Sequence, residues 1–278
     1  MQGPIGGKIG EKIGEGAYAD VHAWAPGQVV KLFKPNIPMS LCWHEAQMTQ
    51  IAFTVGAPAP QLFGTMIIEG RFAMLLQRWD GPTLLQLVRA GTTTRGQAGA
   101  ILAALFLAVH KTVPPPDIFP LRASMESGLR YAGDRLPKHI ATGILALIER
   151  LQPADGLCHA DIHPGNVIMT EEGPRLIDWM GMIRGPAALD LASTHFLLDE
   201  IAPLAADDPE RPRALNAALQ SEYARLSGTP PAALRSAIES WLPVAYARAL
   251  FGEAMHAHKE RLIGRIEAAL RSERLGSG

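Results

Sequence analysis

Two carboxylates and one amide lie close together in this sequence, in types and at spacings that suit chemistry on phosphates. The segment HADIHPGN, residues 159–166, contains Asp161 and ends at Asn166, and Asp178 follows Asn166 by twelve residues. Phosphoryl transfer from a magnesium nucleotide needs one carboxylate to accept a hydroxyl proton, and a carboxylate and an amide to hold metal on the phosphates. The segment and Asp178 together supply all three groups.

The residues around this segment predict a hairpin that brings two of these groups together. Residues 167–169 and 176–177 are short apolar runs typical of strands, and residues 171–174 have the composition of a turn. A hairpin of this length returns Asp178 to the end of the ladder where Asn166 lies, within reach of one cation. The alternative is a helix-capping Asp and a turn Asn without common function, which the eight-residue pattern and the hairpin disfavour.

A glycine-rich turn near the N-terminus predicts contact with phosphates. Residues 13–21 place Gly14 and Gly16 between two β-like runs. Glycines let backbone N–H groups approach phosphates without an intervening Cβ atom. A helix after the turn would indicate a dinucleotide fold, but the run that follows is β-like, and Val21 on it is expected to lie over the adenine.

Lys31 lies within the apolar run Val29–Leu32, where a charge is costly unless it is paired. Glu45, fourteen residues later on a predicted helix, is the expected partner. In kinases such a lysine reaches the α- and β-phosphates and the glutamate holds it. Two alternatives remain, because Lys34 lies three residues beyond Lys31 and His44 adjoins Glu45.

The remaining patterns predict an α+β protein with a sheet-rich first part and a mainly helical second part. Strands are expected at 8–14, 19–24, 28–33, 62–68 and 72–77, and helices at 39–55 (capped by Ser40), 83–90, 95–111, 121–132, 138–151, 187–201, 212–226 and 231–274, the last with a possible break at Pro243. We therefore expect a small N-terminal antiparallel β lobe with one helix at residues 1–80, a hinge at 78–81, and a larger helical lobe at 81–278.

Composition narrows the class of protein. A chain of 278 residues can bury a sizeable core, and its formal net charge of −1 gives no general attraction to nucleic acid or anionic lipid. Cys42 and Cys158 lie far apart, which suggests neither a zinc site nor a disulfide framework. The first ten residues lack the apolar segment of a signal peptide, and the uncharged run 96–109 is shorter than the ~20 residues of a membrane span. We expect a cytoplasmic protein that contacts neither nucleic acid nor membrane.

Together these segments resemble the aminoglycoside phosphotransferase and choline kinase-like family, small-molecule kinases with the protein-kinase fold. HADIHPGN is similar to the family pattern HGDxHPGN, residues 176–179 (LIDW) resemble its metal-binding strand, and residues 185–192 (GPAALDLA) resemble the segment that follows. Two residues depart from the pattern. Ala160 replaces the usual glycine, which should be tolerated, and Ala19 replaces the third glycine of the phosphate loop.

The resemblance implies a role for each matching residue. Asp161 would be the catalytic base, Asn166 and Asp178 the Mg²⁺ ligands, and Asp190 a support of the catalytic loop. His163, two residues after Asp161, would either contact the transition state or only shape the loop.

Other residues are assigned from their place in the chain. Gln77 and Trp79, beside the hinge, complete the residues assigned to the nucleotide. His159 is expected to pack inward and hydrogen-bond backbone, and His110 to cap helix carbonyls.

The acceptor is expected to be a hydroxyl of a small molecule such as an amino sugar, sugar or amino alcohol. Leu189 follows Trp179 by ten residues, too few for the activation segment that docks a peptide in protein kinases. Residues 201–278 hold nine Asp/Glu against ten Lys/Arg, a balance that does not favour a polycationic aminoglycoside. The donor is expected to be ATP, with GTP possible. The alternatives are a catalytically silent nucleotide-binding regulator of the same fold or, with less support, a protein kinase.

Overall fold

The computed structural model describes residues 8–133, 136–151, 154–251 and 253–275 of this chain. The chain forms two compact units. The first, the N-terminal unit, comprises the residues up to Thr92 together with Pro164–Gly181. The second, the helical unit, comprises Thr93–His163 and the residues from Met182 onward. Asn166 and Asp178 therefore belong to the N-terminal unit, and Asp161 belongs to the helical unit.

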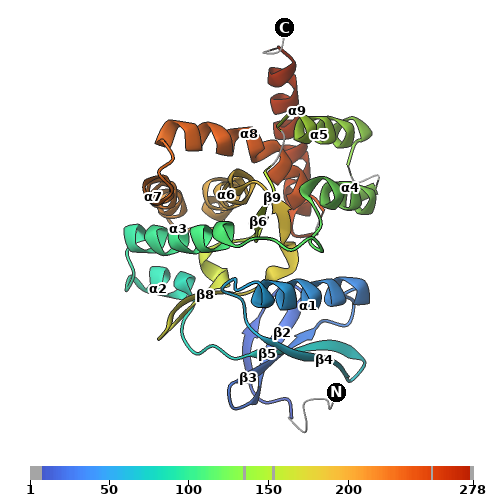
Figure 1. The fold of residues 1–278 in the computed structure, drawn as a ribbon, viewed down its shortest axis with the longest axis vertical. Helices are drawn as coiled ribbons and strands as arrows, with labels where there is room; N and C mark the ends of the chain where they lie inside the picture. The colour runs from blue at the N-terminus through green and yellow to red at the C-terminus, as the bar shows by residue number, and fades with distance from the viewer. Residues whose placement is uncertain (1–7, 134–135, 152–153, 252, 276–278) are drawn as a thin grey trace. The chain divides into compact units, whose positions relative to one another are not determined.

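A five-stranded antiparallel sheet forms much of the N-terminal unit, in the strand order β1-β2-β3-β5-β4 (Figure 1). Its strands are β1 (Lys12–Glu15), β2 (Ala19–Ala25), β3 (Gln28–Phe33), β4 (Leu62–Ile68) and β5 (Arg71–Gln77). The five expected strands are present, and the main difference is that β1 begins at Lys12 rather than at residue 8. Gly10 before it still donates a backbone hydrogen bond to Ala23, but outside the regular ladder.

Helix α1 (Met39–Thr54) packs against one face of this sheet. The buried residues of this core are Ala19, Phe33, Cys42, Ala46, Phe72 and Met74. The expected cap at Ser40 is wrong, because the helix already begins at Met39 and Ser40 lies within its first turn. Pro38 precedes the helix with a φ of −56°, and its carbonyl accepts the N–H of Leu41 at 2.9 Å. The fixed φ of proline suits a helix start without a side-chain cap.

The predicted hairpin is present as β7 (Val167–Thr170) and β8 (Gly173–Leu176). The turn is shorter than expected, since Gly173 lies opposite Thr170 and Pro174 lies opposite Met169. Pro174 is tolerated because it lies opposite Met169, whose N–H donates to Pro82 rather than across the hairpin, so this pair needs no ladder bond from residue 174.

The chain leaving β5 packs against this hairpin. The backbone N–H of Met169 donates to Pro82 at 2.9 Å, and Gly81 has a φ of +147°. A Cβ atom on Gly81 would lie 2.0 Å from the carbonyl oxygen of Met169, so the position requires glycine. Helix α2 (Leu84–Ala90) then begins with a capping box formed by Thr83 and Gln86.

The helical unit consists of helices and a short two-stranded sheet (Figure 1). Its longer elements are α3 (Arg95–Lys111), α4 (Leu121–Ala132), α5 (Lys138–Leu151), β6 (Gly156–Cys158), β9 (Ile183–Gly185), α6 (Ala187–Phe196), α7 (Glu210–Ser227), α8 (Pro231–Ala249) and α9 (Lys259–Leu275). Helix α3 packs along α7, and α6 packs along α8. The bounds of α3, α4 and α5 agree with the sequence prediction.

Two expectations for the later helices are wrong. The helix expected at 187–201 changes to a π-helical turn at Leu197–Ile201. The helix expected at 231–274 is two helices, but Pro243 lies inside α8 and the interruption comes after Ala249. Pro243 removes one helix hydrogen bond, and the buried neighbours Val244 and Ala245 hold the helix together across it.

The expected class is confirmed: an antiparallel sheet with one packed helix in the N-terminal part, and a mainly helical remainder. Across the described residues, no helix is both long and apolar enough to cross a membrane.

Candidate active site

Three charged side chains of the N-terminal unit meet beside β3. Lys31 on β3 forms an ion pair with Glu45 on α1, the partner that the sequence favoured. The Nζ atom of Lys31 also lies 3.7 Å from Oδ1 of Asp178, which follows β8. Glu45 is 2% exposed, whereas the Asp178 side chain is 35% exposed. A buried carboxylate, that of Glu45, thus holds the lysine, and the lysine also faces the more accessible carboxylate of Asp178.

The two carboxylates keep Lys31 charged. Burial by itself lowers the pKa of Lys31, but the charges of Asp178 and Glu45 raise it, and the net direction is upward. The Oε2 atom of Glu45 is buried without a hydrogen-bond partner among the residues that the structure describes. This cluster, Lys31, Glu45 and Asp178, is called the lysine cluster below.

The two alternatives for this pairing lie elsewhere. Lys34 donates to the backbone carbonyl of Gly16 at 2.9 Å, so it braces the glycine turn. A ring nitrogen of His44 lies 3.1 Å from the backbone oxygen of Met180, and burial lowers the pKa of its imidazole. Both residues therefore have structural partners, and neither takes the place of Lys31 or Glu45.

The glycine turn and Val21 lie on the same sheet as Lys31. Gly14 is in β1, paired with Val21 of β2, and Val21 is paired with Lys31 of β3. Because directly paired residues of antiparallel strands point to the same face, Val21 and Lys31 share a face. The backbone N–H of Gly16 donates to Ala19 at 2.8 Å, which closes a tight turn without a positive φ.

Gln77 and Trp79 lie where β5 ends. The backbone of Gln77 donates to Gln61 at 2.9 Å, and its side-chain oxygen accepts from the N–H of Gln61 at 3.4 Å. Trp79 is half-buried in the segment that leads to Gly81. Their expected contact with a nucleotide stays a prediction.

The base of the β7–β8 hairpin places Asn166 and Asp178 as the sequence predicted. The N–H of Ile177 donates to the carbonyl of Asn166 at 3.0 Å, one residue before Asp178. Asp178 has a φ of +66°, a left-handed conformation that Asp tolerates better than most residues.

The donor chemistry at this hairpin fits Mg²⁺. An amide and a carboxylate are hard oxygen donors, and Mg²⁺ commonly takes few protein ligands together with phosphates and water. Among the residues that the structure describes, no group of three or more His, Cys, Asp or Glu could hold a metal by itself. Two protein ligands leave the other coordination positions of Mg²⁺ to phosphate oxygens and water.

In the helical unit, Asp161 lies on the loop after β6 with its side chain 52% exposed. The ring Nε2 of His163 lies 3.8 Å from Oδ2 of Asp161, which is an ion pair only when the imidazole is protonated. Asp161 also lines a cavity of about 230 Å³ in this unit, together with residues of α6 and α8. The carboxylate is therefore accessible to a small molecule.

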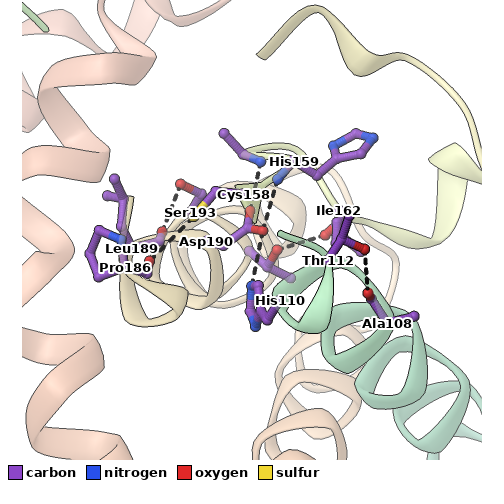
Figure 2. A network of polar contacts seen from close by, with 12 residues as sticks. Ala108, His110, Thr112, Cys158, His159, Ile162, Pro186, Leu189, Asp190 and Ser193 are labelled. Carbon is purple, nitrogen blue, oxygen red and sulfur yellow. Dashed lines mark hydrogen bonds and ion pairs between the residues drawn. The ribbon is translucent and has the colours of Figure 1, made fainter. Parts of the chain in front are cut away.

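Asp190 of α6 anchors the backbone of this loop (Figure 2). Its Oδ2 accepts the N–H of His159 at 3.0 Å and its Oδ1 accepts the N–H of Ala160 at 2.6 Å. Nε2 of His110 lies 3.2 Å from Oδ2, and Tyr223 contacts Nδ1 of His110 at 2.9 Å. Asp190 is fully buried, and all of these contacts satisfy its charge.

The network also corrects one expectation and reveals a residue that the sequence did not. His110 does not cap helix carbonyls, because its two ring nitrogens contact Asp190 and Tyr223. Burial, with the nearby charge of Asp190, raises the pKa of Tyr223 to about 12, so the phenol stays protonated and can donate to His110. Tyr223 lies 113 residues from His110 in sequence, and no local pattern relates the two.

Two further contacts fix the next residues of the loop. His159 is fully buried, and its Nδ1 accepts the N–H of Asp161 at 3.3 Å, in agreement with the expected inward packing. Thr194, one helical turn after Asp190, donates its hydroxyl to the carbonyl of Ile162 at 2.6 Å. The backbone on both sides of the Asp161 side chain is thus held by buried groups.

The chain belongs to the phosphotransferase enzyme family, whose family model matches residues 12–228. This match extends from β1 through α7 and includes all of the predicted site residues. Curated protein sequences give no match to this chain.

Solved structures of small-molecule kinases resemble it. An ethanolamine kinase of Plasmodium vivax is 13% identical with a TM-score of 0.61, and the match covers 96% of this chain and 83% of that one. A choline kinase of Cryptosporidium parvum is 14% identical with a TM-score of 0.59, covering 98% and 91%. An aminoglycoside phosphotransferase of Streptomyces rimosus, solved with ADP and streptomycin, is 18% identical with a TM-score of 0.51, covering 84% and 90%. At these identities the likeness establishes the fold, which is the expected protein-kinase-like one.

Proposed function

We propose that this phosphotransferase moves the γ-phosphoryl group of ATP to a hydroxyl of a small molecule. The observation that carries the proposal is the lysine cluster, in which Lys31 lies between buried Glu45 and accessible Asp178. A charged lysine fixed in this way is suited to bind phosphate oxygens, because its position does not depend on the ligand.

In this proposal each residue of the N-terminal unit has a separate task. Lys31 holds the α- and β-phosphates and Glu45 positions Lys31. The nucleotide site is lined by Gly14, Gly16, Val21, Gln77 and Trp79. Asn166 and Asp178 hold Mg²⁺, which when bound would neutralise charge on the transferring phosphoryl group.

Asp161 is proposed to act on the acceptor. Its carboxylate orients the acceptor hydroxyl and takes the proton as the new O–P bond forms and the bond from the γ-phosphorus to the departing ADP breaks. The partly exposed side chain and the anchored backbone suit this role, since the carboxylate is accessible while its position is fixed. His163, 3.8 Å from Asp161, either contacts the transferring group or holds the loop.

The kinases of similar fold support the kinds of substrate proposed. The Streptomyces rimosus structure contains ADP and streptomycin, and the other two are kinases of ethanolamine and choline. By analogy we propose an adenine nucleotide as donor and a small hydroxyl compound as acceptor. A division into a nucleotide-gripping lobe at 1–80 and an acceptor-binding lobe at 81–278 remains part of the proposal.

A catalytically silent nucleotide-binding protein is the second candidate. The loss of a catalytic group would favour this candidate. Every residue type that phosphoryl transfer needs is nevertheless present, at Lys31, Glu45, Asp161, Asn166 and Asp178. A protein kinase is disfavoured, because only Ile183–Gly185 and short turns separate Trp179 from the start of α6 at Ala187.

The test is Asp161→Asn, which keeps the size of the side chain but removes its charge and basicity. We expect kcat with a reactive acceptor to fall about 10²–10⁴-fold, with nucleotide affinity unchanged. Turnover across a panel of amino sugars, sugars, amino alcohols and hydroxy acids is measured beside a nucleotide-binding titration. Asp117→Asn, an exposed Asp of the same unit, is the control. Wild-type turnover in Asp161→Asn would refute the assignment.

A further inference from the structure

The cavity beside Asp161 has an unusual balance of side chains for an acceptor site. Its volume is about 230 Å³, below the usual ~300–1,000 Å³ of drug-sized ligand pockets. Its lining includes Asp161, Phe196, Leu197, Ala245, Arg248 and Ala249. In the described lining, the charged groups are one carboxylate and one guanidinium. A cavity of this size admits a small molecule that is mostly apolar on one side.

The guanidinium comes from a part of the chain outside the family match. The match ends at residue 228, directly after α7, whereas Ala245, Arg248 and Ala249 belong to α8. One wall of the cavity therefore carries Asp161 and other residues of the matched region, and a second wall carries residues of α8, which lie outside that region. Residues of that second wall are the ones expected to distinguish acceptors.

Arg248 is held in a partly buried environment among acidic groups. Burial lowers the pKa of Arg248, while the nearby Cys158, Asp190 and Asp161 oppose this shift. An arginine side chain remains charged at any physiological pH even so. Its planar fork of five N–H donors can bind both oxygens of a carboxylate while it keeps another contact.

We propose that Arg248 selects acceptors that carry a carboxylate, so that the acceptor is a small hydroxy acid whose hydroxyl is presented to Asp161. This inference rests on the proposed phosphotransfer and specifies its substrate class. A polycationic acceptor would bring positive charge against Arg248 in a confined space, which is unfavourable. The nine Asp/Glu and ten Lys/Arg of residues 201–278 provide no compensating acidic excess.

A purely structural role for Arg248, as a counter-charge for Asp161 and Asp190, makes a different prediction. Removing a counter-charge alters Asp161 for every acceptor alike. Removing a substrate-binding group alters only acceptors that carry the group it binds. Pairs of acceptors that differ only in the carboxylate therefore separate the two roles.

The experiment measures kcat/KM for nucleotide consumption with three pairs: D-glycerate and ethylene glycol, L-serine and ethanolamine, and L-homoserine and 3-amino-1-propanol. Binding of each compound is titrated in parallel in the presence of magnesium and a non-hydrolysable ATP analogue. We expect wild type to favour the acid in at least one pair. Arg248→Gln should reduce kcat/KM for that acid about 10- to 100-fold, because its charge-assisted hydrogen bonds are lost. The same substitution should change kcat/KM for the neutral or amino partner less than about 3-fold.

Two further variants complete the test. Arg248→Lys keeps the charge without the fork and should recover part of the discrimination. Arg235→Gln, an exposed arginine of the same helix, should change nothing. Melting temperatures identify any variant that fails to fold, in which case Arg248→Lys provides the comparison.

Several outcomes would overturn the inference: equal losses for both members of a pair, a wild type that favours the acid in none of the three pairs, or no acid that reacts or binds. Failure of the proposed function looks different. In that case Asp161→Asn would leave nucleotide consumption unchanged whichever acceptor is present.

Discussion

The lysine cluster of the N-terminal unit and the Asp190 network of the helical unit both bury a carboxylate, but they satisfy it differently. In the first, Glu45 bonds Lys31 through one oxygen, and its other oxygen has no partner among the residues that the structure describes. In the second, both oxygens of Asp190 accept hydrogen bonds, which come from two backbone N–H groups and from the imidazole ring of His110.

The difference indicates what each cluster is for. A lysine between two carboxylates, one of them accessible, can exchange one partner for a phosphate without leaving a buried charge unpaired. A carboxylate with every oxygen engaged offers nothing to a ligand and instead fixes backbone. We therefore expect changes in the lysine cluster to affect turnover more than folding, and changes in the Asp190 network to do the reverse.

The largest effect is expected from Asp178→Asn. The variant keeps a side chain that tolerates a φ of +66° but removes the negative charge proposed to hold Mg²⁺. Metal contributes several kcal/mol to the transition state, so we expect magnesium-dependent turnover to fall about 10³-fold or more, with a melting temperature close to wild type. Asp80→Asn, at an exposed residue of the same unit, is the control. Near-normal turnover would remove Asp178 from the mechanism.

The next effect concerns Lys31 and Glu45. Lys31→Met should reduce kcat/KM about 10²-fold, the scale of losing one preorganised charged contact to the reacting group. Glu45→Gln should cost less, because one amide oxygen can still accept from Lys31. The double variant should be no worse than Lys31→Met, because both substitutions break one ion pair. Additive losses in a double-mutant cycle would mean that Lys31 is positioned by some other group.

In the Asp190 network, Asp190→Asn should lower stability by about 3 kcal/mol, because one backbone N–H or His110 loses its charged acceptor. Burial by itself raises the pKa of Asp190. His110 and the backbone N–H of His159 lower this pKa by more than burial raises it, so the net direction is downward. Asp190 therefore contributes its full stability above roughly pH 4, and loses it as pH falls through the lowered folded-state pKa.

Chemical unfolding of both proteins across pH 2 to 7 tests this dependence, with the pH range set by ordinary Asp values of about 4. The gap between wild type and Asp190→Asn should be constant near neutrality and shrink under acid. A gap that does not depend on pH would show that the charge of Asp190 is not what holds the loop.

The two clusters also differ in how far the sequence predicts them. Lys31 and Glu45 could be paired from the sequence because a charge in an apolar strand requires a partner, and the next helix offers one. The hairpin that carries Asn166 and Asp178 could be predicted because strand and turn signals are local. Asp190 was found only through its resemblance to a family segment.

His110 and Tyr223 show why the rest could not be predicted. Their contact depends on how α3 packs along α7, which helix periodicity does not specify. Similarly, the sequence offered Pro243 as a helix break, yet burial of the neighbouring side chains keeps α8 continuous there. In both cases the outcome depended on tertiary packing, which local sequence patterns do not specify.

The smallest effect is expected at Ala160, where the Asp190 network holds an alanine in a backbone conformation that a residue with a Cβ atom disfavours. Ala160 has a φ of +67°, and its N–H is held at 2.6 Å by Asp190. A left-handed conformation costs a residue with a Cβ about 1–2 kcal/mol, whereas glycine adds roughly 0.4–1 kcal/mol of unfolded-state entropy. Ala160→Gly should therefore stabilise the protein by about 0.5–1 kcal/mol, raising the melting temperature by roughly 2 °C.

The matched control for this prediction is Ala104→Gly, at an exposed position inside α3. There the same substitution has no strain to relieve and should destabilise by about 1 kcal/mol. The free energy of unfolding of both variants is measured with denaturant, and turnover is followed in parallel. Changes of opposite sign in this free energy at the two positions would locate stored strain in the loop that the Asp190 network holds. If both variants are destabilised alike, Ala160 bears no strain, and the network holds the loop in a conformation that alanine adopts freely.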